Sequence, residues 1–215
     1  EIARTKRSVQ LAEDLKAHSV VLHTPFYTNR RFRRWLETEL PDYQKTTDIL
    51  LLVENMPCYR KPGGRLGRRL GIADVQQRDP KFFWKLIPAS LNPLCFPLSD
   101  LDLMEQFENI ILDVTHLATG GHDPIQNFDR FREKIRHIHL SNFDGREHLE
   151  MESGLIDMEA FLTHIKKSGY RGGLCLEIMP EYFPAEDEKE TIALLKRNRE
   201  VIRRLENERL PEAQK

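Results

Sequence analysis

The chain has 215 residues, of which 40% are hydrophobic and 31% charged, and its formal net charge is −1. This composition is typical of a globular protein with one sizeable core, and no apolar run reaches the roughly 18 residues of a membrane span, so we expect no membrane partner. The three cysteines, Cys58, Cys95 and Cys175, form no CxxC pair, which favours a reducing cytoplasmic location. Cys175 is expected to be a small core residue.

Five short apolar runs, each typical of a buried β-strand, end in an acidic or imidazole side chain. In chain order these side chains are His23, Glu54, Asp113 with His116, His139 and Glu177. A charged group at the end of a buried strand is costly unless it is paired or bound to a metal. The recurrence therefore predicts that the five strand ends share one site.

Stretches with helical periodicity alternate with these strands. They span residues 8–18, 31–40, 98–107, 128–135 and 157–170, and a final helix with a mixed-charge outer face follows over 191–208. Strict alternation predicts an α/β fold with a parallel sheet. The architecture that gathers the side chains at strand ends is the (β/α)8 or TIM barrel.

A complete barrel usually needs about 250 residues and eight strands. Because this chain begins at Glu1 without an initiator Met and shows five strands, we expect one partial TIM-barrel domain over 1–215, with strands four to eight present and the first three lacking. A complete open sheet of five strands is the alternative. The segment 57–98 is rich in Gly, Pro and aromatic residues, and we expect a lid or a partner-contact insertion there.

Two clusters of basic residues directly follow the first two predicted strands. They contain Arg30, Arg31, Arg33 and Arg34, and then Arg60, Lys61, Arg65, Arg68 and Arg69. In a barrel, connections after strands lie on the catalytic face, so the clusters could form a positive rim that attracts phosphate or another anion. The alternative is a solvated helix face and an exposed loop.

The order of several motifs resembles one known family. HTP, VENMP, LDVTHLATGG, HLSNFDGREHL followed by SGLIDMEAFL, and GYRGGLCLEI occur in this order between about Leu11 and Pro180. Their order and spacing are similar to the xylose-isomerase-like TIM-barrel superfamily, which includes sugar and sugar-phosphate isomerases and epimerases and the metal-dependent apurinic/apyrimidinic endonucleases.

The resemblance implies a metal site and an acid–base pair. In the epimerase-like members, two Glu, one Asp and one His hold a single divalent ion, and these match Glu54, Asp113, His139 and Glu177. Such oxygen-rich ligation suits Mn, Mg, Co or Zn. The resemblance also makes Glu54 and Glu177 the catalytic residues, which remove a proton from one face of a ketose and return it through an enediolate.

Four further residues are predicted to contact substrate. By resemblance, His116 binds substrate in epimerases or a second metal in endonucleases, and His23 and His148 fit positions that hold additional metals in the endonucleases. Arg146 could reach a substrate hydroxyl or phosphate. The structural alternatives are a helix N-cap for His116, a hydrogen-bonded core histidine for His23, and solvated loop residues for Arg146 and His148.

Two residues depart from the family patterns. Arg146 stands where the endonucleases have an Asp ligand, which should damage a trinuclear site, and Asn142 stands where many epimerase-like members have Asp. We therefore predict a metal-dependent isomerase or epimerase that acts on a small sugar, ketose or sugar phosphate. The protein could also form a homo-oligomer. The alternatives are an endonuclease-like phosphodiesterase with abasic DNA as its nucleic-acid partner, and a non-catalytic binding protein on a decayed barrel.

Overall fold

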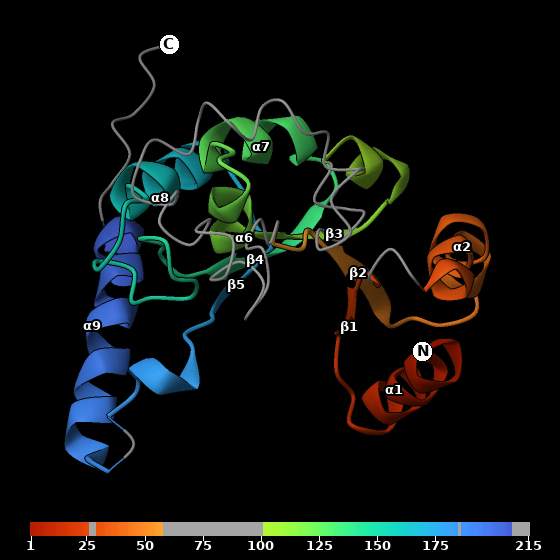
Figure 1. Ribbon diagram of the computed structural model, residues 1–215, viewed down its shortest axis with the longest axis horizontal. Helices are drawn as coiled ribbons and strands as arrows, with labels where there is room; N and C mark the ends of the chain where they lie inside the picture. Colours follow the sequence, from red (N-terminus) through yellow and green to blue (C-terminus); the bar gives the residue numbers. More distant parts are fainter. Residues whose placement is uncertain (26–28, 58–100, 185, 208–215) are drawn as a thin grey trace, which may run out of the picture. The chain divides into compact units, whose positions relative to one another are not determined.

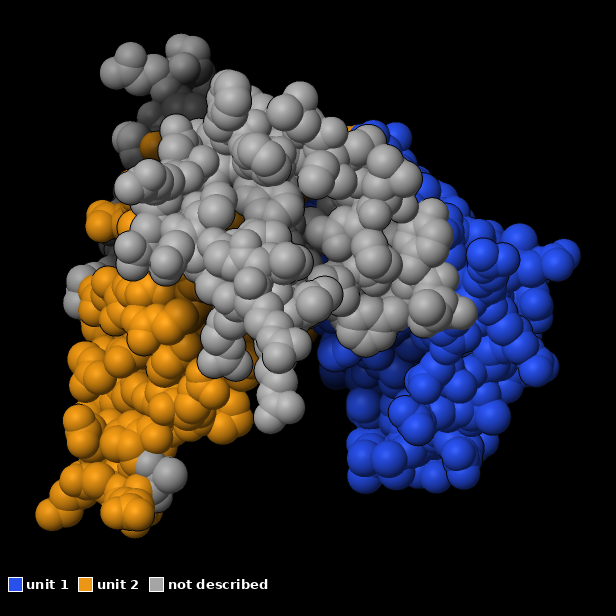
Figure 2. Space-filling view, viewed as in Figure 1, with its two compact units in different colours: residues 1–111 blue, residues 112–215 orange. Residues whose placement is uncertain are grey.

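The computed structural model describes residues 1–25, 29–57, 101–184 and 186–207. The chain divides into two compact units, residues 1–111 and 112–215, which Figure 2 colours separately. The prediction of a single domain stays a prediction. The predicted lid, apart from Pro57, and the second basic cluster lie outside the described residues.

The first unit alternates helices and strands. Its elements are α1 (Ile2–Asp14), β1 (Ser19–His23), α2 (Arg30–Thr38), α3 (Leu40–Gln44), β2 (Leu50–Glu54), the 3-10 helix η5 (Leu101–Gln106) and the start of β3 (Ile110–Asp113) (Figure 1). β1 and β2 are parallel, with their last residues His23 and Glu54 paired in register. β2 is also parallel to β3, where Glu54 pairs with Ile111. The carboxyl ends of these strands therefore point the same way.

The second unit continues the alternation. After the end of β3 come α6 (Val114–Thr119), α7 (Pro124–Phe131), β4 (Ile135–Leu140), α8 (Met158–Lys167), β5 (Gly173–Leu176), the 3-10 helix η6 (Pro180–Tyr182) and α9 (Glu188–Asn207). β4 and β5 are parallel, from His137 opposite Gly173 to Leu140 opposite Leu176. The strand order is β1-β2-β3-β4-β5. The predicted α/β class with five parallel strands is confirmed.

Helix boundaries follow local capping chemistry. The side chains of Asn29, Asp113, Asp123 and Asp157 each accept a hydrogen bond from a backbone N–H in the first turn of α2, α6, α7 and α8. Such caps satisfy N–H groups that have no partner inside the helix. Two expected boundaries differ in the structure. α1 starts at Ile2, without a side-chain cap, rather than at residue 8, and the helix expected over 98–107 is a 3-10 helix over Leu101–Gln106 in the described residues.

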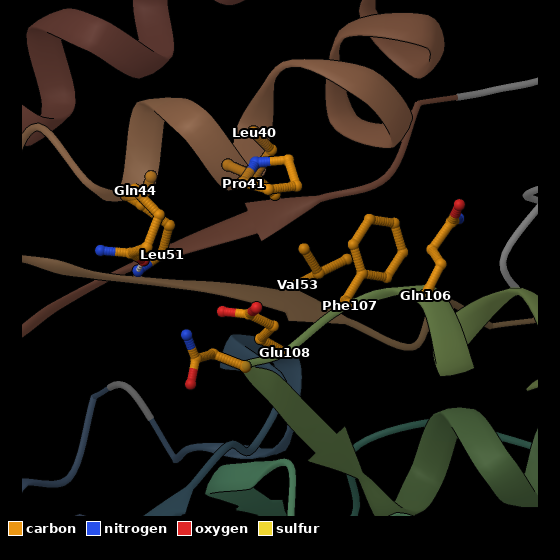
Figure 3. A pocket seen from close by; sticks show the side chains of 9 residues that line it. Leu40, Pro41, Gln44, Leu51, Val53, Gln106, Phe107 and Glu108 are labelled. Atoms are coloured by element: carbon orange, nitrogen blue, oxygen red, sulfur yellow. Dashed lines mark hydrogen bonds between the residues drawn. The ribbon is translucent and has the colours of Figure 1, made fainter.

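Strand alternation separates the two faces of β2. Leu51 and Val53 lie on one face, and Leu52 and Glu54 on the other. On the Leu51 and Val53 face, a cavity of about 70 Å³ is lined by residues of α3, β2 and the segment 106–109 (Figure 3). It is too small for a sugar, and it lies on the face of β2 opposite Glu54.

The core of the second unit forms between β4 and its helices. Ile138 and Leu140 on one face of β4 are fully buried, as are Phe128 of α7 and Phe161 of α8, whose rings meet edge to face at 6.3 Å. Each such aromatic side chain typically contributes about 3–5 kcal/mol to stability. This packing fixes the opposite face of β4, which carries His139.

β5 differs from the expectation of a buried strand. Its residues are exposed or only half-buried, and Cys175 is an exposed free thiol, so the prediction of a small core residue is wrong for Cys175. β5 is the last strand in the sheet order and pairs with β4 alone among the described residues. In the described residues, no helix has the length and apolar character needed to cross a membrane.

Candidate metal centre

Asp113 holds the turn from β3 into α6. It is the last residue of the strand and the N-cap of the helix, and its Oδ1 accepts a hydrogen bond of 2.7 Å from the backbone N–H of His116. This turn brings the Nδ1 of His116 to 3.8 Å from the same carboxylate. Both side chains are buried, at 7% exposed for His116 and 0% for Asp113.

His139 and Glu177 meet because β4 and β5 run side by side. The backbone N–H of Glu177 donates to the carbonyl of Leu140 at 3.0 Å, which extends the β4–β5 ladder by one residue. The Nδ1 of His139 then lies 2.7 Å from the Oε2 of Glu177 and 3.6 Å from the Oδ2 of Asp113. One imidazole nitrogen thus stands between two carboxylates.

The charge state of Glu177 follows from these neighbours. The hydrogen bond from His139 holds the pKa of Glu177 below its ordinary value of 4.5, although partial burial and the charge of Asp113 both raise it. The side chain remains 43% exposed, whereas His139 is 12% exposed. Glu177 is therefore a carboxylate at neutral pH that solvent or a small molecule can reach.

The donor set of the second unit fits a divalent metal ion. Asp113, His139 and Glu177 offer ligand atoms within 4.8 Å of one another. Bonds of about 2.0–2.2 Å to nitrogen and oxygen place two ligands of one zinc ion within about 4.4 Å, so small side-chain movements would complete the coordination. A mixed carboxylate and imidazole set suits Zn, Mn or Co. This buried His/Asp/Glu group could hold a metal.

Asp113 also belongs to a second donor group. Asp113, His116 and His148 are all buried and offer ligand atoms within 4.8 Å of one another. The rings of His116 and His148 meet edge to face at 5.1 Å. His148 is therefore not the solvated loop residue of the alternative interpretation. Its predicted contact with substrate stays a prediction.

Two hydroxyl residues contact this second group, and the sequence did not identify them. Ser141 Oγ lies 3.1 Å from His148 Nδ1 and 2.8 Å from Thr115 Oγ1, and all three side chains are buried. Alternation along the strand gave a weak indication for Ser141, because Ser141 lies two residues after His139 and so continues the same face. Thr115 gave no signal, since its contact with Ser141 joins residues 26 apart in sequence.

The hydrogen bonds of Asn142 account for an amide at this position, where many epimerase-like proteins have Asp. Its amide donates to the carbonyls of Met151 and Ile156, and its Oδ1 accepts from the backbone N–H groups of Phe143 and Ile156. Asp could not donate those two hydrogen bonds. Asn142 therefore organises the loop after β4.

Glu54 and His23 lie in the first unit. Glu54 ends β2 with its side chain 1% exposed, and its Oε2 is 3.0 Å from the Nε2 of His23 at the end of β1. The His23 side chain is 67% exposed, so it is not the core histidine of the alternative interpretation. The roles predicted for Glu54 as a metal ligand and catalytic residue, and for His23 in substrate binding, stay predictions.

Arg146 lies on the surface of the loop after β4. Its guanidinium makes two hydrogen bonds to the carboxylate of Asp144, at 3.1 and 2.6 Å, and lies 5.7 Å from the ring centre of Tyr182. The side chain is 64% exposed. The ion pair holds the guanidinium in one place, and its predicted contact with substrate remains a prediction.

Comparisons with known proteins agree with the fold. An uncharacterized protein of Mycobacterium leprae is 27% identical over 194 residues, covering 89% of this chain and 66% of the relative, so the chain spans just under two thirds of that relative. An inosose dehydratase of Lacticaseibacillus casei is 26% identical over 88 residues, which is 32% of this chain and 30% of that protein. The crystal structure of a D-tagatose 3-epimerase-like protein matches with a TM-score of 0.57 at 17% identity, covering 93% of this chain and 67% of the other.

A family profile matches the part of the chain that carries most of the candidate metal centre. Residues 102–200 match the family profile described as xylose isomerase-like TIM barrel, and this range contains Asp113, His116, His139, His148 and Glu177. Over this segment the chain is similar to the xylose isomerase-like TIM-barrel family, which confirms the resemblance predicted from its motifs.

Proposed function

We propose that this chain carries the active centre of a divalent-metal-dependent isomerase or epimerase that acts on a small sugar, ketose or sugar phosphate. The observation that carries the proposal is the position of His139 between the carboxylates of Asp113 and Glu177, with one of these carboxylates buried and the other accessible. A structural ion pair needs only one carboxylate, whereas an oxygen-rich ligand set for a divalent ion uses several oxygen donors.

The proposed ligands are Asp113, His139 and Glu177, with Glu54 as the fourth. Glu54 enters from the motif order and from its buried position at the end of β2 in its own unit. A divalent ion bound there would polarise a substrate carbonyl and so acidify the neighbouring C–H group. The metal identity, among Mn, Mg, Co and Zn, is left to experiment.

Glu177 is the proposed base. It is deprotonated at neutral pH, its Oε2 is oriented by His139, and its exposed edge leaves room for a substrate carbon. A positioned carboxylate that takes this proton contributes about 10²–10⁴-fold to rate. Glu54 is the proposed partner that works on the other substrate face, with His23 hydrogen-bonded to it as a relay or substrate contact.

The named relatives support chemistry beside a carbonyl group. One is called a dehydratase of inosose and one resembles a D-tagatose 3-epimerase. We propose isomerisation or epimerisation for this protein, so the substrate skeleton keeps all its atoms. Loss of water from the substrate would replace this proposal with a lyase reaction.

The test is proton exchange at carbon. The protein, loaded with Mn²⁺ in deuterated water, is incubated with a panel of ketoses and ketose phosphates, and deuterium incorporation is followed by NMR. Wild-type protein should exchange one substrate C–H, and Glu177→Gln should reduce the rate by about 100-fold or more. The control is Glu186→Gln, which makes the same change at an exposed carboxylate of the same unit.

Retained exchange in Glu177→Gln would remove this residue from the mechanism. Exchange that falls equally in both variants would point to a nonspecific effect of the substitution. If wild-type protein binds metal but exchanges no proton with any ketose in the panel, the isomerase proposal fails.

A second candidate is a phosphodiesterase that acts on abasic DNA. The donor group of Asp113, His116 and His148 favours it, because phosphodiester hydrolysis often uses ions that share a carboxylate. Two or three zinc ions per chain, together with salt-sensitive cleavage of an abasic duplex, would support this candidate over the first.

A further inference from the structure

Three buried side chains form a continuous hydrogen-bonded chain that ends at a histidine ring. The Oγ1 of Thr115, at the start of α6, lies 2.8 Å from Ser141 Oγ, and Ser141 Oγ lies 3.1 Å from His148 Nδ1. At its other end, Thr115 Oγ1 donates to the carbonyl oxygen of Asn142 at 3.3 Å. Ser141 and Thr115 are each 0% exposed.

The direction of this hydrogen-bonded chain depends on where Thr115 donates its single hydroxyl proton. When Thr115 donates to the carbonyl of Asn142, which can only accept, its proton is no longer available to Ser141. Ser141 must then donate its own proton to Thr115. With that proton committed, Ser141 Oγ accepts from His148, and the proton of the imidazole is therefore on Nδ1.

We propose that Thr115 and Ser141 are positioning residues that hold the ring of His148 in the tautomer with a proton on Nδ1 and a free lone pair on Nε2. That lone pair is what a metal ligand or a hydrogen-bond acceptor needs. The ligand atoms of His148, Asp113 and His116 lie within 4.8 Å of one another. The two hydroxyl groups would therefore orient one ligand of the second donor group. Only the role of the lone pair toward metal rests on the second candidate function, which uses this donor group.

The backbone around His148 holds its ring beside the hydroxyl groups of Ser141 and Thr115. His148 has a positive φ of 56°, which is uncommon for a residue other than glycine. Next to it, the backbone groups of Asn142 and Leu149 pair in both directions at 3.0 Å, and the carbonyl of His148 accepts from the N–H of Met179 at 3.0 Å. Because Leu149 and the carbonyl of His148 are both held, we expect the ring to respond to the hydroxyl groups by changing its proton position.

The opposite chain direction is the competing arrangement. If Thr115 donated to Ser141, then Ser141 would donate to His148 Nδ1, and the ring proton would move to Nε2. An N–H group would then point toward ligands that need a lone pair. The two directions therefore predict opposite tautomers for the same ring.

The experiment reads the tautomer directly by ¹⁵N NMR of the histidine rings in metal-free protein, with His148 identified from the signals lost in His148→Gln. Wild-type protein should carry the proton on Nδ1. Thr115→Val, which frees the Ser141 proton to point at the ring, should shift the population toward the Nε2 tautomer. Thr115→Ser keeps the hydroxyl and should retain the wild-type tautomer.

Zinc titration of the same variants gives the second readout. Thr115→Val should weaken Zn²⁺ binding by about tenfold or more, since outer groups that orient a histidine ligand matter to this degree, and Thr115→Ser should not. If Thr115→Val does not fold, Ser141→Ala provides the same comparison, because it removes the acceptor of the Nδ1 proton.

An Nε2 proton in wild-type protein, or an unchanged tautomer in folded Thr115→Val, would overturn the proposal. A tautomer that shifts as expected in a protein that binds no zinc would support the hydroxyl chain and count against the metal centre. Failure of this inference and failure of the proposed function are therefore distinguishable.

Discussion

At the scale of single residues, Asp113 performs two tasks with its two carboxylate oxygens. Oδ1 caps α6 through the N–H of His116, and Oδ2 faces His139. Replacement by alanine removes both functions, so any loss of metal in that variant would be confounded by loss of the helix cap. Replacement by asparagine keeps the capping oxygen and removes the charge.

The first prediction separates the two tasks by stability. In metal-free buffer, Asp113→Ala should lower the free energy of unfolding by about 1 kcal/mol more than Asp113→Asn, because only alanine loses the N-cap acceptor. Urea denaturation of both variants measures the difference. Equal destabilisation would mean that the cap contributes nothing to stability.

The second prediction concerns Arg146. Arg146→Ala should weaken binding of a ketose phosphate by a few-fold relative to its neutral sugar, because an exposed ion pair is worth at most about 1 kcal/mol. Binding constants for the two ligands give the ratio, and Arg199→Ala on the exposed face of α9 is the control. Equal losses for both ligands would remove Arg146 from phosphate recognition.

At the scale of elements, the loop between β4 and α8 is built around one amide side chain. Asn142 makes four hydrogen bonds to the backbone of residues 143–156, and a Cβ on Gly154 would come within 2.2 Å of its Oδ1. The loop therefore needs glycine at 154 and an amide at 142. The loop in turn positions His148.

The third prediction tests the role of Asn142 in this loop. Asn142→Asp should destabilise the protein by about 3 kcal/mol or more, because two buried carbonyls lose their donors and a buried charge takes their place. Asn29→Asp is the matched control, because Asn29 caps α2 as a hydrogen-bond acceptor and a carboxylate can accept the same hydrogen bond. Destabilisation of similar size in both variants would contradict the account of Asn142.

The sequence predicted the elements better than their contacts. Apolar runs ending in His or acidic residues identified all five strands, because strand burial leaves a local pattern. The predicted boundaries of α1 and η5 were wrong, and α1 begins without a side-chain cap that the sequence could have signalled. The chain from Thr115 to His148 escaped prediction because its members are distant in sequence and meet only when β4 lies beside α6.

At the scale of the whole molecule, the family pattern and the candidate metal centre fall on the same segment of the chain. Residues 102–200 match the family, and this range contains Asp113, His139 and Glu177. The chain spans 66% of the Mycobacterium leprae relative. Activity of the whole protein is thus a proposal, whereas metal binding is a property that this chain can be tested for by itself.

The fourth prediction links metal binding to stability. An ion that binds only the folded state, supplied at about 100 times its dissociation constant, should stabilise the protein by about 2.7 kcal/mol. Thermal unfolding with and without Mn²⁺ or Zn²⁺ measures the shift. Asp113→Asn should show little shift, and an equal shift in that variant would place the ion elsewhere.

The most direct test of the central claim is metal content per chain, measured by inductively coupled plasma mass spectrometry on protein purified without chelator. Asp113→Asn is compared with Asp123→Asn, the same change at the N-cap of α7. The account predicts about one divalent ion in wild-type protein and Asp123→Asn, and loss of that ion in Asp113→Asn. No metal under any loading condition, or equal metal in all three proteins, would contradict the account.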